Sequence, residues 1–240
     1  MEDRFGLQAT DPEFAERMEA FALNEVVNEP GMELDDKTRN IAIMASLMGC
    51  QAIDLYKVVL EKALDGAVTQ VEAKEIVYQA CDYLGFGKAY PFIQATNEVM
   101  KNKGIALPLE GQATTTMEDR LEKGVQAQVS IFGPAMSEAY KASHINRWLA
   151  ANCFGDYYTR TGLDLKQREM VTFCFLLAQG GCEPQLTSHA MGNIALGNDK
   201  LFLMKVVSQC IPYVGYPRTL NAVTCINNAW EQMEKMIQKK

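Results

Sequence analysis

Apolar residues recur at helical spacing along most of the chain. Ile41, Met44, Ala45 and Met48 are one example of this spacing. Side chains three and four residues apart lie on the same face of a helix, so this pattern predicts helices that pack one face against a core. Runs with the alternating pattern of a strand are scarce. The sequence therefore predicts an all-α protein.

Residues typical of helix ends mark the limits of the predicted helices. Aspartate, threonine and proline favour helix starts, and glycine favours helix ends. The predicted starts are Asp35–Asp36, Thr69, Asp164 and Glu183–Pro184. The predicted ends are Gly66, Gly85, Gly197 and Gly215.

A stretch without helical period divides the chain near its middle. Residues 104–116 combine glycine, proline and threonine, which is typical of a linker. We therefore expect a first unit over residues 1–103 and a second over residues 117–240.

The two halves share landmarks in the same order. Leu34–Arg39 matches Leu163–Arg168, and a Gly-Cys pair follows in each half, at Gly49–Cys50 and at Gly181–Cys182. The separation is about 130 residues, which indicates two tandem copies of one helical unit. Each copy would bury its apolar face against the other or in an oligomer.

Charge and composition exclude several classes of partner. The chain has 240 residues, 48% of them hydrophobic, and a net charge of -7. Its lysines and arginines do not form a dense basic cluster in the sequence. Nucleic acid is therefore a poor partner. The longest near-apolar stretch, Ile41–Ile53, is too short to span a bilayer, and the first residues do not look like a leader, so we expect no membrane contact and a cytoplasmic protein.

The cysteines and histidines do not suggest a metal or a disulfide framework. The 7 cysteines are an odd number without regular spacing, so we interpret them as reduced, mainly buried thiols. Only 2 histidines are present, no Cys-x-x-Cys occurs, and nucleotide-binding loops are absent. We expect neither a metal nor a cofactor.

One group of residues in the second half could be reactive. Cys182 precedes a predicted helix whose N-terminus would favour a thiolate. His189 lies further along the same helix, and Glu169 could reach it from the helix before. Each residue also has a plain structural interpretation. His189 would be a core histidine with its hydrogen bonds satisfied, and Cys182 a small residue at a turn. Glu169 would be a first-turn helix residue beside a solvated Arg168.

Three segments carry a resemblance to a known family. They are Leu163–Glu169, Leu186–Gly197 and Tyr213–Arg218. They resemble the Arg-Glu helix, the His helix ending in Ala-x-x-x-Gly, and the Tyr-x-Gly-x-Pro close of the carboxymuconolactone decarboxylase family, which includes alkylhydroperoxidase D-like proteins. The first half is similar to the same outline more weakly.

The departures from the family pattern bear on activity. Peroxidases of the family carry Cys-x-x-Cys before the histidine, whereas Gln185 stands at the second cysteine position here. In the first half, Asn40 replaces the glutamate and Lys57 falls at the histidine position. We therefore expect the first copy to be degenerate and the second to be active.

Three functions remain open at this point. The resemblance implies a cofactor-independent decarboxylase or related lyase acting on a small carboxylated lactone or keto acid, with His189 as general acid, Glu169 as its orienting partner and Arg168 as a substrate-carboxylate contact. The first alternative is a peroxidase or thiol oxidoreductase that uses Cys182. The second is a non-catalytic helical binding assembly. The family resemblance also implies a homo-oligomer, and two units per chain predict a trimer.

Overall fold

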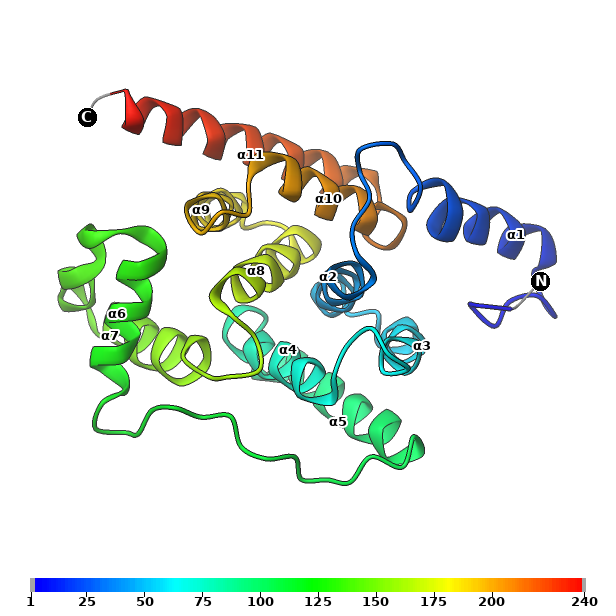
Figure 1. Cartoon of the computed structure of the whole chain (residues 1–240), viewed down its shortest axis with the longest axis horizontal. Helices are drawn as coiled ribbons and strands as arrows, with labels where there is room; N and C mark the ends of the chain where they lie inside the picture. Colours follow the sequence, from blue (N-terminus) through cyan, green and yellow to red (C-terminus); the bar gives the residue numbers. More distant parts are fainter. Residues whose placement is uncertain (1–2, 239–240) are drawn as a thin grey trace.

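The computed structural model describes residues 3–238, and these residues form helices without any strand (Figure 1). The all-α prediction is confirmed. The helices of the first half are α1 (Pro12–Ala20), the π-helix η1 (Phe21–Glu25), α2 (Asp36–Gly49), α3 (Ile53–Ala63), α4 (Gln70–Tyr83) and α5 (Phe86–Asn102). Those of the second half are α6 (Arg120–Phe132), the 3-10 helix η2 (Pro134–Ala142), α7 (His144–Trp148), the π-helix η3 (Leu149–Tyr158), α8 (Leu165–Gln179), α9 (Glu183–Ala195), α10 (Lys200–Val214) and α11 (Tyr216–Ile237).

The predicted helix starts are confirmed by their hydrogen bonds. The side chains of Asp35, Thr69 and Asp164 each accept a bond from a backbone N–H three residues further on. These bonds satisfy donors that have no partner inside the helix. Gly85 and Gly215, which follow α4 and α10, have φ values of 86° and 80°. A side chain is disfavoured at such angles, so glycine lets the chain turn sharply into the next helix.

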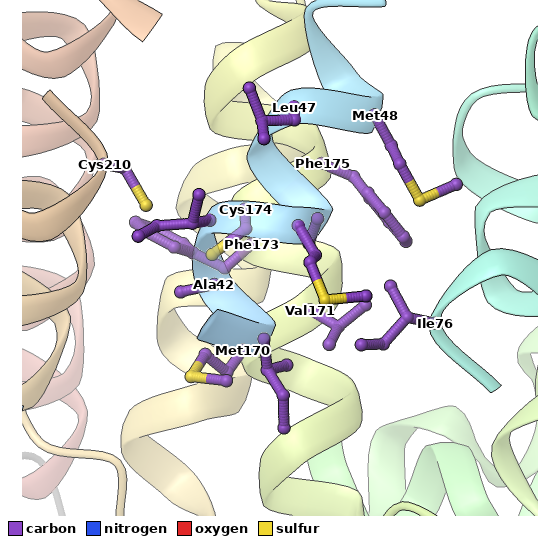
Figure 2. Packing of buried hydrophobic residues seen from close by; sticks show 14 of the residues in the cluster. Ala42, Leu47, Met48, Ile76, Met170, Val171, Phe173, Cys174, Phe175 and Cys210 are labelled. Atoms are coloured by element: carbon purple, nitrogen blue, oxygen red, sulfur yellow. The ribbon is translucent and has the colours of Figure 1, made fainter. Parts of the chain in front are cut away.

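Helices α2 and α8 form the centre of the protein. Every residue of 41–49 in α2 and of 168–178 in α8 is buried. Helices α10 and α11 cover them on one side, and α4 and α5 on the other (Figure 1). In Figure 2, Ile76 of α4 and Cys210 of α10 point toward the α2–α8 contact from opposite sides. Helices surrounded in this way have no face to solvent, which explains why most of these residues are apolar on every side.

The same order of four helices occurs in each half. Helices α2 to α5 and α8 to α11 follow one another with similar lengths and similar turns. One continuous core joins both sets. That the sets are tandem copies, with limits at residues 1–103 and 117–240, stays a prediction.

The segment 104–116 contains no helix, and its end is fixed to the second half. The hydroxyls of Thr114 and Thr115 donate to the backbone oxygens of Thr159 and Gly155, at 2.8 and 3.0 Å. The segment is therefore anchored along η3 before α6 begins.

Helix α6 and the π-helix η3 cross at two glycines. A Cβ atom on Gly124 would collide with the backbone oxygen of Ala150, and one on Gly155 with that of Arg120. The two backbones therefore touch without side chains between them. This close approach holds Cys153 and Tyr158 of η3 in a small second cluster with Ile131 of α6.

A buried ion pair connects the first half to the second. Arg168 of α8 is completely buried, and its Nη2 donates to the Glu75 carboxylate of α4 at 3.0 Å. Its Nη1 donates to Gln79 at 3.0 Å, and Nη2 also donates to the backbone oxygens of residues 160 and 161. Arg160 adds a second guanidinium on Glu75. Our interpretation of Arg168 as a substrate contact does not agree with this placement, because its guanidinium is turned inward and occupied.

No helix among residues 3–238 is both long and apolar enough to cross a membrane.

Removing this buried cation tests its structural role. We expect Arg168→Met to lower the free energy of unfolding by about 3 kcal/mol, since breaking a buried pair leaves a carboxylate poorly compensated. The control is Arg17→Met, because the Arg17 side chain is 79% exposed and its pair with Glu13 is a surface pair. Urea titrations followed by circular dichroism measure both variants. Equal stability of Arg168→Met and wild type would contradict the structural role.

Candidate active site

Glu169 and His189 meet within one chain. The Nδ1 atom of His189 on α9 lies 2.9 Å from Oε2 of Glu169 on α8. The Glu169 side chain is fully buried, whereas that of His189 is 12% exposed. The pair therefore consists of an enclosed carboxylate and a ring that reaches the surface at one edge.

The hydrogen bonds around Glu169 fix the direction of each proton. Tyr158 donates its one hydroxyl hydrogen to Oε1 of Glu169 at 2.8 Å. Tyr83, 2.9 Å away, donates to the Tyr158 oxygen. The hydroxyl of Thr172, 2.7 Å from that oxygen, must then donate as well, and Gln79 in turn donates to Thr172 at 2.9 Å. Every hydrogen of this chain points toward the carboxylate.

The proton positions of His189 follow from the charge of Glu169. An ionised carboxylate accepts hydrogen bonds at both oxygens, so in that form Nδ1 of His189 donates to Oε2. A neutral ring paired in this way has its lone pair on Nε2. Nε2 is the nitrogen that remains for chemistry.

Two aromatic rings hold the imidazole in place. Tyr83 and Phe132 contact it edge-on, with centroids 5.3 and 5.6 Å away and interplanar angles of 83° and 80°. Gly192 leaves the space that this packing needs, because a Cβ atom there would lie 2.7 Å from Oε2 of Glu169 and 2.9 Å from Phe132. The ring therefore has little freedom to leave its carboxylate.

Asn193 fixes α9 against α8. Its Nδ2 donates to the backbone oxygens of Glu169 and His189, at 2.9 and 2.8 Å. Asn198 donates to Oδ1 of Asn193 at 2.9 Å and so orients the amide. These bonds connect the backbones that carry the two members of the pair.

Burial keeps the surrounding hydroxyls and the nearby thiol protonated. It raises the pKa of Tyr83, of Tyr158 and of Cys153 well above their ordinary values. Cys153 donates its S–H to the Tyr83 oxygen at 3.5 Å. Asp82 lies in the same region, and burial together with the charge of Asp156 raises its pKa to about 8. The buried surroundings of the pair thus disfavour additional negative charge.

Cys182 lies at the start of α9, as predicted, but not as a thiolate. Its half-buried Sγ donates to the backbone oxygen of Leu176 at 3.5 Å. Burial raises its pKa, and the opposing hydrogen bond from Gln179 does not reverse this direction. Burial thus opposes the thiolate that we expected the helix start to favour.

The matching positions of the first half do not form such a pair. Asn40 turns its amide back to donate to the Asp36 backbone oxygen at 2.7 Å. Lys57 lies at the surface, where it pairs with Glu98 at 2.7 Å. These residues have no acid-base contact with each other in the structure.

The sequence interpretation missed the residues that hold Glu169. We gave no site role to Tyr83, Tyr158, Thr172 or Gln79. One signal was present: Glu75, Gln79 and Tyr83 recur every four residues and so share one face of the predicted helix. A polar stripe on a buried helix indicates partners on a neighbouring element.

An apolar cleft of about 300 Å³ adjoins the pair. It shares Phe132 and Gly192 with the site, and its walls come from α6, α9 and α11. The remaining lining residues are 129–131, Gly133, Met191, Ala195, Met233 and Met236. Neither Glu169 nor His189 is among its described lining residues, so the cleft lies next to the residues that surround the pair. Residues 3–238 contain no group of three or more histidine, cysteine, aspartate or glutamate side chains placed to hold a metal.

In comparisons with known proteins, one segment of the chain matches a family model. No curated protein matches the chain. The model of the Carboxymuconolactone decarboxylase family matches residues 144–227, a segment from α7 into α11 that includes Glu169, Cys182 and His189. The part of the chain that holds the Glu169–His189 pair is therefore similar to the Carboxymuconolactone decarboxylase family.

Proposed function

We propose that this protein is a cofactor-independent decarboxylase or related lyase of the carboxymuconolactone decarboxylase type, with its active site in the second half. The observation that carries the proposal is the 2.9 Å contact between His189 Nδ1 and a fully buried Glu169 carboxylate. A carboxylate in this position orients the imidazole and stabilises its protonated form, so that Nε2 exchanges protons with a substrate.

The chemistry requires one proton transfer to carbon. In a carboxylated lactone or keto acid, the bond to the carboxylate carbon breaks and its electron pair passes into an enolate or dienolate. Carbon dioxide leaves, and protonated His189 then delivers its Nε2 proton to the substrate carbon. Glu169 stays ionised throughout and balances the imidazolium charge. Water returns the proton to Nε2 after product release.

The surroundings of the pair support decarboxylation, a reaction in which the negative charge of a carboxylate is dispersed. The adjoining cleft is lined mainly by apolar side chains, including Phe132 and Met191. An apolar wall disfavours the carboxylate relative to a transition state in which its charge spreads into the ring or chain. Arg168 has no role in substrate binding in this proposal, because its guanidinium is buried against Glu75.

A thiol peroxidase ranks second, and a non-catalytic binding assembly third. Cys182 lies at the start of the histidine helix, which is the feature that keeps the peroxidase in consideration. The raised pKa of Cys182 and the glutamine at position 185 both disfavour it. Cys225 is a candidate for the resolving thiol, because its Sγ donates to the backbone oxygen of Glu183, the residue after Cys182.

A homotrimer is part of the proposal. Phe86 and Tyr90 at the start of α5 are 62% and 50% exposed, and Tyr216 and Leu220 at the start of α11 are 61% and 63% exposed. Each half thus presents a large apolar pair at the same position after its turn glycine. Equivalent faces on two similar units suit a closed ring of subunits. We place the protein in the cytoplasm, with a small-molecule substrate.

The His189–Glu169 pair is tested by substitution. We expect His189→Ala and Glu169→Gln to lower turnover by about 10²- to 10⁴-fold, because both remove the proton donor or its orientation. The assay measures carbon dioxide released from carboxymuconolactone and from a panel of 2-keto acids. Lys57→Ala is the matched control on α3, and it should retain the wild-type rate.

Two results would contradict this proposal. One is the absence of carbon dioxide release from every compound tested. The other is an equal loss of turnover in Lys57→Ala with an unchanged circular dichroism spectrum, which would place the activity in the first half.

The role of Cys182 separates the lyase from the peroxidase. We expect Cys182→Ser to retain most of the turnover, and wild type to form no intramolecular disulfide under stoichiometric peroxide. Intact mass with thiol alkylation measures the disulfide, and Cys225→Ser is the control for pairing. A loss of about two hydrogen masses that maps to Cys182, together with an inactive Cys182→Ser, would favour the peroxidase.

The oligomeric state is tested by light scattering. We expect a particle of about three times the 26.7 kDa of one chain. A variant with Phe86→Glu and Tyr216→Glu should dissociate, because it places charge in both apolar pairs. A wild-type mass of one chain across micromolar concentrations would exclude the trimer.

A further inference from the structure

A second cavity lies in the first half, in the position that corresponds to the His189 site. It has a volume of about 270 Å³. Asn40 of α2 lines it at the position that Glu169 has in α8, and Tyr213 of α10 lines it at the position that Tyr83 has in α4. The cavity is therefore lined in part by the helices that match those of the His189 site, and its described lining contains no histidine and no glutamate.

Two cations that reach the cavity carry the argument in an acidic protein. Arg39 and Lys62 are among the described residues that line it, together with the carboxylate of Asp36. The Asp36 side chain is 79% exposed and pairs with Arg39 at 2.9 Å. The chain as a whole has a net charge of -7, so this local excess of cations is not a general property of its surface.

Arg39 lacks the buried anion that its counterpart in the second half has. Arg168 is paired with the buried carboxylate of Glu75 on α4. Counting back from the glycine after each helix, the residue of α10 that matches Glu75 is Lys205. Arg39 instead pairs with the exposed Asp36, and its buried Nε has no hydrogen-bond partner among the described residues. A ligand carboxylate would supply the buried anion that this half lacks.

The remaining lining defines the shape of that ligand. Leu23, Ile43 and Val59 contribute apolar walls from η1, α2 and α3. Burial raises the pKa of Tyr213 to about 12 despite the nearby charge of Arg39, so its hydroxyl remains a donor. A volume just under the roughly 300 Å³ of the smallest common ligand pockets fits a molecule of one ring or a short chain.

We propose that the first-half cavity binds a small organic carboxylate with an apolar body and does not convert it, with Arg39 and Lys62 as the anion contacts. The absence of an acid-base pair at Asn40 and Lys57 limits the site to binding. The inference does not depend on the lyase activity of the second half, because it concerns a different cavity.

The test uses 4-fluorobenzoate as the probe and fluorine NMR as the measurement. We expect binding to the full-length protein with a dissociation constant on the order of 1 mM or below. Arg39→Met and Lys62→Met should each weaken it by about tenfold or more, the usual effect of losing a charge-assisted hydrogen bond. His189→Ala should leave it unchanged, which separates this cavity from the second-half site.

Two controls make the result specific. Lys57→Met removes a cation from the same helix as Lys62, but from a surface pair, and should bind the probe like wild type. The neutral analogue 4-fluorobenzamide should bind at least about tenfold more weakly, and inorganic phosphate should not displace the probe at equal concentration.

Four outcomes would overturn the proposal: no binding of 4-fluorobenzoate up to about 10 mM, unchanged binding in both cation variants, equal binding of the benzamide, or displacement by phosphate. Circular dichroism of each variant excludes a loss of fold as the cause of weaker binding. Because Arg39 and Lys62 lie on different helices, a folding defect of one variant leaves the other as an independent test.

Discussion

The buried ion pair between Arg168 and Glu75 determines how the two halves meet. A charge that is removed from water must be matched closely, so the pair fixes the position of α4 along α8. One turn further on, Gln79 reaches Thr172, and one turn beyond that, Tyr83 reaches the region of Tyr158. The ion pair thus sets the register that brings a tyrosine of the first half to the carboxylate of the second.

The proposed active site depends on a second balance of charge, around Glu169. The carboxylate is fully buried, and hydrogen-bond donors approach both of its oxygens. Because Tyr158 has one hydrogen to give, its neighbours are forced to act as donors toward it. An ionised Glu169 then takes its second hydrogen bond from Nδ1 of His189 and leaves Nε2 outside the pair. The aromatic contacts keep the imidazole in one orientation, as an acid-base catalyst requires.

Much of the fold could be predicted from the sequence, because helix periodicity and capping are local. Asp35, Thr69 and Asp164 cap the helices they were expected to begin, and glycines follow the helices they were expected to end. The Glu169–His189 contact was also expected, since both residues fall on adjacent helices of a recognisable motif.

What could not be predicted depends on burial and on contacts between the halves. The charge of Arg168 suggested a substrate contact, but its complete burial is not visible in the local sequence. Cys182 lies at a helix start as predicted, and only the structure reveals that desolvation raises its pKa. Tyr158 comes from a π-helix, whose extra residue per turn breaks the periodicity used to align side chains.

The exchange of tyrosines between the halves has a consequence for dividing the chain. Tyr83 from α4 completes the surroundings of His189, and Tyr213 from α10 lines the cavity beside Asn40. A cut within residues 104–116 would give two fragments, each lacking an aromatic wall that the other holds. The family match at residues 144–227 contains Glu169 and His189 but neither Tyr83 nor Phe132, the two rings that contact the imidazole. Neither half is a self-sufficient module, and an engineered fragment would need both α4 and α8 to reproduce the site.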